Sequence, residues 1–288
     1  MHWFILSLIA ALGTSVNDAI SKCFFSDLTA YEMGLIRFFY AFPYLVIGLI
    51  VVPWSEADTT FWTCLAVGLP LELAAFLCYM RAIKVSPLSL TVPFLAFTPA
   101  FVILTGYLLL DELLNPYGII GIILILIGSY VLNLSWVKYE WLAPLRAIFK
   151  EQGSWLMLLT SLIYSFTATL GKLAIEHSSP QFFAVTYFLI FSLLLFFLFP
   201  FIPGTKIGNL VRRPFPGIMA GLVLAVMIFS HTLAISLIQA AYMLSVKRSS
   251  LLFAVLFGAV FFKEKNIKER MLGASIMMTG VCMIGFFN

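Results

Sequence analysis

Stretches of about 20 mostly apolar residues follow one another along almost the whole chain, and an α-helix of that length crosses the hydrocarbon core of a bilayer. Soluble domains carry roughly a quarter charged residues. This chain is 62% hydrophobic and 10% charged, so it cannot cover a water-facing surface. The stretches do not alternate as barrel strands do, and only helices and closed barrels satisfy the backbone in lipid. We therefore predict an all-α integral membrane protein.

The apolar stretches predict ten transmembrane helices joined mostly by short polar connections. Their expected ranges are 3–22, 33–52, 61–82, 88–110, 117–135, 155–175, 181–202, 216–237, 240–262 and 270–287. The longest connection, 136–154, carries several charged residues and separates two five-helix units, 1–135 and 155–288. Pro87 precedes the fourth stretch, and Pro93 and Pro99 fall within it. Because each proline removes a backbone donor, we predict kinks in this span.

The second unit repeats the first at a constant shift of about 152 residues, which is typical of a duplication. The matched positions include Gly106 with Gly258, Glu112 with Glu264, Gly121 with Gly273 and Gly128 with Gly280. An odd number of spans per unit forces the second copy to be inverted, as in secondary transporters with a site near mid-depth. We interpret the glycines as helix–helix contacts and the two acids as structural caps or loop anchors.

Polar and ionisable groups inside apolar spans are the candidate functional residues, because a charge in lipid costs several kcal/mol. The candidate substrate-binding residues are Asn17, Asp18, Lys22, Arg37, Glu72, Lys172, His231, Tyr242, Lys247 and Arg248. Lys247 and Arg248 lie about 12 Å into their span at 1.5 Å per residue. Two adjacent cations at that depth favour a function over packing. Glu72 lies midway along its span and needs a buried partner, for which Arg37 and Lys247 are candidates, or a proton.

Several of these residues also admit structural roles. Lys22 and Arg37 lie near span ends, where long cationic side chains reach the interface. His231 fits a helix-packing role or titration near neutral pH. Lys172 is the repeat counterpart of Lys22 and is expected toward the opposite mouth, so these two lysines are candidate gates. The set is cationic in balance, which favours a substrate with a carboxylate or another anionic group.

The sequence contains no motif that indicates an enzyme, a cofactor or a metal site. The four cysteines and three histidines are far apart, and there is no phosphate-cradling glycine loop and no G-x-S-x-G. No basic cluster indicates nucleic acid. We expect a small-molecule substrate and the lipid bilayer as partners, protons as a candidate coupling ion, and a monomer or homodimer.

Two segments resemble the repeat signature of the drug/metabolite transporter superfamily, and most closely its ten-span EamA branch. The first contains Leu88–Pro93, Thr98-Pro99, Gly106, Asp111-Glu112, Gly121 and Gly128; the second contains Ser245–Arg248, Gly258, Glu264, Arg270, Gly273 and Gly280. The resemblance implies ten helices in two inverted halves, a central cavity, and export of amino acids or related metabolites. It supplies no catalytic residues.

Charge bias and family resemblance give opposite orientations. Lys and Arg lie almost entirely in the odd-numbered connections, which the positive-inside rule assigns to the cytoplasm, so both termini are expected outside. The resemblance implies termini inside. We expect a multi-pass protein of a cell inner membrane or plasma membrane. The alternatives are a non-transporting sensor or assembly subunit, a small cationic drug exporter, and a membrane-embedded enzyme.

Overall fold

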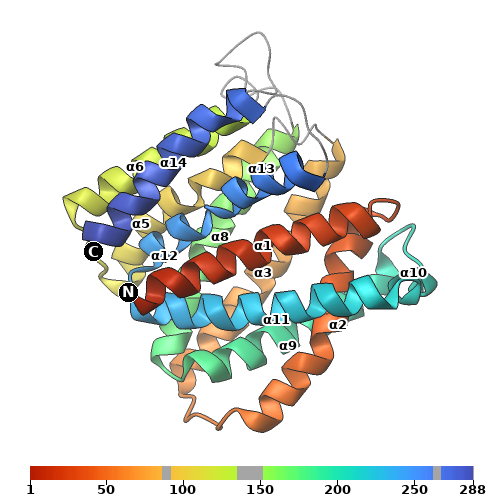
Figure 1. Ribbon diagram of the computed structural model, residues 1–288. Helices are drawn as coiled ribbons and strands as arrows, with labels where there is room; N and C mark the ends of the chain where they lie inside the picture. The colour runs from red at the N-terminus through yellow and green to blue at the C-terminus, as the bar shows by residue number, and fades with distance from the viewer. Residues whose placement is uncertain (86–91, 135–151, 262–266, 288) are drawn as a thin grey trace.

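The computed structural model describes residues 1–85, 92–134, 152–261 and 267–287, and within them the chain is helical without strands (Figure 1). The elements are α1 (His2–Phe24), α2 (Ala30–Val51), α3 (Thr59–Val85), η1 (Val92–Phe97), α5 (Thr98–Leu110), α6 (Pro116–Leu134), α8 (Gln152–Glu176), α9 (Pro180–Leu198), η2 (Phe199–Phe201), α10 (Ile207–Val211), α11 (Pro214–Leu237), α12 (Ala240–Lys247), α13 (Ser250–Phe261) and α14 (Ile267–Phe287). Pro87, Glu264 and most of the predicted connection 136–154 lie outside the described residues.

Helix length and composition make this a multi-pass membrane protein. Among the described residues, six helical runs are long and apolar enough to cross a membrane: α1, α2, α3, α8, α9 with η2, and α11. Shorter apolar helices at Phe94–Leu110, Pro116–Val131 and Leu272–Phe287 add to them. Large apolar side chains such as Ile5, Ile47 and Leu104 are exposed, as expected of a surface that faces lipid.

Two of the predicted spans are interrupted. In the fourth, the 3₁₀-helix η1 leads into α5 at Thr98, and in the ninth, α12 ends at Lys247 and α13 begins at Ser250. The sequence predicted a kink in the fourth span but a continuous ninth one. In the ninth, Ser249 N donates to Val246 O at 2.9 Å, a bond that tightens the turn in 3₁₀ fashion. Thr98 and Ser250 differ by the repeat shift, so both interruptions occupy matched positions.

The same helix pairs are in contact in both repeats: where two helices pack together, their repeat counterparts also pack together. By sequence, α1, α2, α3, α5 and α6 correspond to α8, α9, α11, α13 and α14. α1 packs on α11 as α8 packs on α3, and α11 packs on α2 as α3 packs on α9. α6 with α14, and α2 with α9, are contacts between a helix and its own counterpart. The repeat in the sequence is therefore also a repeat in the packing.

Glycines let α6 and α14 approach closely, and the two helices lie side by side in Figure 1. A Cβ on Gly128 would lie 2.6 Å from Met277 N and 2.7 Å from Gly273 O, and one on Gly280 would lie 2.6 Å from Gly121 O. Backbone therefore contacts backbone at these points. This confirms the interpretation of these repeated glycines as helix–helix contacts.

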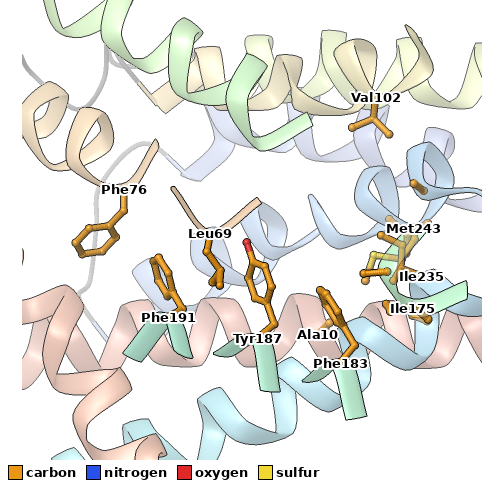
Figure 2. Close-up of a cluster of buried hydrophobic side chains, with 14 of the residues drawn as sticks. Ala10, Leu69, Phe76, Val102, Ile175, Phe183, Tyr187, Phe191, Ile235 and Met243 are labelled. Carbon is orange, nitrogen blue, oxygen red and sulfur yellow. The ribbon is translucent and has the colours of Figure 1, made fainter. Parts of the chain in front are cut away.

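The core between α3 and α9 is built from large apolar and aromatic side chains. Figure 2 shows Phe183, Tyr187 and Phe191, spaced four residues apart on α9, directed toward Leu69 and Phe76 of α3. The rings of Phe76 and Phe191 lie 6.3 Å apart, nearly perpendicular, and those of Phe183 and Tyr187 stack at 5.0 Å. This packing fixes the rotation of α9 and points the Tyr187 hydroxyl inward.

Polar contacts join the α1–α2 connection to α10. Thr29 and Glu32 form a capping box at the start of α2, and the Glu32 carboxylate also accepts the Lys206 N–H at 2.9 Å. Asp27 pairs with Arg213 at 2.7 Å, and this hydrogen bond holds the pKa of the Asp27 carboxyl below its ordinary value. The beginning of α11 is thereby anchored to the end of α1.

Candidate functional site

The interruption between α12 and α13 presents the two deep cations. Lys247 is the last residue of α12 and Arg248 is its C-cap. Cations are favoured at a helix C-terminus because the last carbonyl groups carry partial negative charge. Both side chains are partly buried. The local backbone thus explains how two adjacent cations are held inside an apolar bundle.

Lys247 interacts with residues of two other helices. Its Nζ lies 3.4 Å from Nδ1 of His231 in α11. Glu72 of α3 acts electrostatically on Lys247, and its carboxylate interacts with the hydroxyl of Thr167 in α8. Of the two partners predicted for Glu72, Lys247 is the one whose charge acts on it. Elements of both halves therefore converge on this lysine.

Arg248 reaches across the repeat. Its Nη2 donates to Oγ1 of Thr98 at 2.8 Å, and Thr98 in turn donates to Leu95 O at 2.7 Å. Thr98 stands where η1 becomes α5. The interruption of the ninth span is therefore hydrogen-bonded to the matched interruption of the fourth.

Three tyrosines that the sequence reasoning did not single out complete this group. Tyr79 and Tyr164 both interact electrostatically with Arg248, and Tyr187 interacts with Glu72 and Tyr164. The Tyr187 hydroxyl is buried and, among the described residues, has no hydrogen-bond partner. Tyrosines in membrane proteins concentrate at the two interfaces. Tyr164 and Tyr187 lie well inside their spans, and this position was the signal that could have identified them.

An ion pair joins α1 and α2. Arg37 Nη1 lies 3.5 Å from Asp18 Oδ1. The Asp18 side chain is 61% exposed although it sits within an apolar helix. The Nε of Arg37 is buried and has no hydrogen-bond partner among the described residues. The charge of Arg37 also acts on Tyr164, so this pair adjoins the group around Arg248.

The balance of charge in this group is positive. The cations are Arg37, Lys247 and Arg248, and the carboxylates are Asp18 and Glu72. Tyrosine and threonine hydroxyls supply neutral donors beside them. One further negative charge would balance these five groups, because an uncompensated buried charge is costly. We call these five residues with His231 and the three tyrosines the central site.

A family model for EamA-like transporters matches residues 1–134 and 152–286. The chain belongs to the EamA-like transporter family. This confirms the resemblance found in the sequence. No curated protein matches this EamA-like chain. A solved structure described as "Crystal structure of protein" is similar over 99% of this chain and 97% of its own, with a TM-score of 0.76 and 12% identity. At that identity the likeness shows the fold alone.

Three other residues predicted to bind substrate in this EamA-like protein are Asn17, Lys22 and Tyr242. Asn17 is buried and donates from Nδ2 to Ala220 O of α11 at 3.1 Å. Lys22 lies exposed in the last turn of α1. Tyr242 is buried over Gly118, where a Cβ would lie 2.2 Å from its ring, and its hydroxyl accepts the Asn115 N–H at 2.8 Å. Asn17 and Tyr242 therefore bond to backbone groups of other segments, Ala220 and Asn115, which are not part of the central site.

Lys172 lies at one mouth of the bundle. It is buried in α8, pairs with Glu112 and donates to Ile238 O at 2.7 Å. Beside it opens a pocket of about 410 Å³ lined by the ends of α5, α8 and α11. α11 begins next to Arg213, which bonds to Phe24 O at the end of α1 that carries Lys22. The other end of α11 lines this pocket. The two lysines therefore lie toward opposite ends of α11.

Within the described ranges, no group of three or more His, Cys, Asp or Glu side chains could hold a metal ion. The four cysteines are free, with Cys64 buried and Cys23 and Cys282 exposed. What the central site offers is a set of charges and hydroxyls held by helices from both halves. A few polar and charged groups placed together inside an apolar structure are typical of a small-molecule site.

Proposed function

We propose that this protein is a secondary transporter of small anionic or zwitterionic metabolites, such as amino acids or organic anions, with export as the expected direction. Ten spans in two inverted five-helix units would enclose the central site, which would open to either side in turn. Family membership supports transport, and the exchange of helix contacts between repeats supports an arrangement of two related halves.

The observation that carries the substrate class is the pair Lys247 and Arg248 at the interruption of the ninth span. A carboxylate bound there would neutralise the excess positive charge of the central site and accept charge-assisted hydrogen bonds. Glu72, next to Lys247, would meet an ammonium group of a zwitterion. Tyr164 and Tyr187 would offer their hydroxyls to the remaining polar atoms.

Proton coupling is part of the same proposal. His231 lies 3.4 Å from Lys247, and Glu72 acts on the same lysine. A bound carboxylate would change the field at both groups, so substrate binding and proton binding would be linked. The measurement is substrate-driven proton movement in proteoliposomes, with the Glu72→Gln variant expected to lose coupling before it loses binding.

A thermal-shift screen of the purified protein tests the substrate class. Amino acids, organic acids, sugars and cationic amines are compared, because a ligand at 100 times its Kd stabilises the native state by about 2.7 kcal/mol. We expect carboxylates to raise the melting temperature of the parent and not of Lys247→Met. Lys206→Met is the matched control, since it removes an exposed lysine outside the central site.

The screen separates the alternatives. If only cationic amines stabilise the protein, the substrate class is wrong and Glu72 or Asp18 becomes the anchor of a cationic drug exporter. If no solute stabilises it, the sensor or assembly-subunit alternative gains support. If carboxylates stabilise the parent and Lys247→Met equally, the cation pair is not the binding site.

A further inference from the structure

Glu112 is folded back over the end of α5. Asp111 takes the left-handed conformation with φ 51°, and Glu112 N donates to Gly106 O at 3.1 Å, which ends the helix. A Cβ on Gly106 would lie 3.0 Å from Glu112 Oε2. The missing side chain at Gly106 therefore makes room for the carboxylate. This gives a physical reason for the spacing of Gly106 and Glu112 in the first unit.

The folded-back carboxylate holds two segments of the other half. It pairs with the ammonium of Lys172 in α8 and accepts the Ala240 N–H at 3.0 and 3.1 Å. Lys172 also donates to Ile238 O at 2.7 Å. The side chains of Glu112 and Lys172 are each only 9% exposed. We call Glu112, Lys172 and the backbone of Ile238 and Ala240 the latch.

The latch is connected to the central site through α12. It fixes the first residue of α12, and the last residue of this eight-residue helix is Lys247. The pocket of about 410 Å³ is lined by Glu112, Lys172 and Ile238 of the latch together with other residues at the ends of α5, α8 and α11. In Figure 1 the end of α11 and the start of α12 lie near the N-terminus, so the latch faces the membrane side that carries that terminus.

We propose that the latch closes this mouth and that its release frees the first turn of α12, which opens the central site to this membrane face. The inference rests on the proposed transport by alternating access. It gives Glu112 a part in the transport cycle in addition to the capping role predicted from the sequence. Lys172 would then act as a gate residue and would not contact the substrate in the closed state.

Cysteine accessibility tests the latch without any substrate. In a chain whose four native cysteines are replaced by alanine, Ser245→Cys is a nearly isosteric reporter on α12, buried between the latch and Lys247. Glu112→Gln removes the charge yet keeps an oxygen that can accept the Ala240 N–H. We expect this variant to speed labelling of the reporter by a membrane-impermeant thiol reagent at least about tenfold, because breaking a buried pair strongly favours the open state.

Matched controls define the result. Asp111→Asn removes the adjacent exposed carboxylate at the same helix end and should leave labelling unchanged. Leu113→Cys, at a 74% exposed position, reports which face the reagent reaches and should label equally in every background. If Glu112→Gln alone fails to fold, the double variant with Lys172→Met removes both charges together and is expected to show the same increase.

Unchanged labelling of the reporter in folded Glu112→Gln and in the double variant would overturn the latch. An equal increase in Asp111→Asn would also overturn it, because loss of any negative charge at this helix end would then speed labelling. Failure of solute transport is detected separately. Labelling requires no substrate, so a parent that moves no solute while the latch variants label faster refutes the transport proposal and supports the latch as a mobile contact.

Discussion

Replacing Gly128 by alanine should destabilise the protein by forcing α6 and α14 apart. The new Cβ would lie 2.6 Å from Met277 N and 2.7 Å from Gly273 O, and both are backbone atoms that cannot rotate away. An ordinary contact begins at 3.4 Å, so α14 must move by about 0.8 Å. Because backbone contacts backbone here, only a separation of the two helices relieves the clash.

The cost follows from the length of the contact. A gap of 0.5–1 Å forfeits roughly a quarter to a half of the dispersion energy of each facing pair. The buried side chains along this contact include Ile125, Met277 and Ile284. Overpacking costs about 1–3 kcal/mol, and the better helix propensity of alanine returns up to about 1 kcal/mol. We expect a net loss of about 2 kcal/mol.

The assay is equilibrium unfolding of the purified protein in mixed micelles with increasing SDS. Gly208→Ala in α10 is the matched control, because a Cβ there meets no atom within 4 Å, and it should be neutral or slightly stabilising. If Gly128→Ala is as stable as the parent while the control behaves as expected, the close approach of α6 and α14 is wrong.

Two further perturbations have defined outcomes. A hydrogen bond from the Phe61 N–H and the nearby His177 hold the pKa of Asp58 below its ordinary value of 3.8, so the stability contributed by this carboxylate is present above that pH and is lost as the pH falls through the lower folded pKa. Thermal unfolding between about pH 5 and pH 2 should show a smaller loss in Asp58→Asn than in the parent, because Asp27, whose pKa is also lowered, contributes its own loss in both. Tyr242→Phe removes the acceptor of the partly buried Asn115 N–H and should cost about 0.5–1.5 kcal/mol in the SDS assay. No change would contradict the contact.

The sequence predicted the membrane class, the duplicated unit and the family because these depend on local composition and on spacing along the chain. It also led to Glu72, Lys247 and Arg248 as candidate site residues, since an ionisable group in an apolar span is recognisable without a fold. It could not show that Arg248 bonds to Thr98, because that contact depends on how two distant helices are rotated about their axes.

Long-range partners account for most of what the sequence left out. Glu112 was recognised as a cap, but the helix that it caps begins at Ala240, in the other half of the chain. Tyr164 and Tyr187 were missed because tyrosine is common in membrane proteins, and only the packing of α8 and α9 directs them inward. The interruption near Ser249 was missed because no proline or glycine marks it.

Solute flux into proteoliposomes tests the central claim most directly. The carboxylate that best stabilises the purified parent is supplied in radiolabelled form, and uptake is compared between the parent, Lys247→Met and the control Lys206→Met. The account predicts saturable uptake by the parent and the control, and at least a tenfold loss in Lys247→Met, since a charge-assisted contact contributes about 1.5–3 kcal/mol. No uptake by the parent, or equal uptake by Lys247→Met, would contradict it.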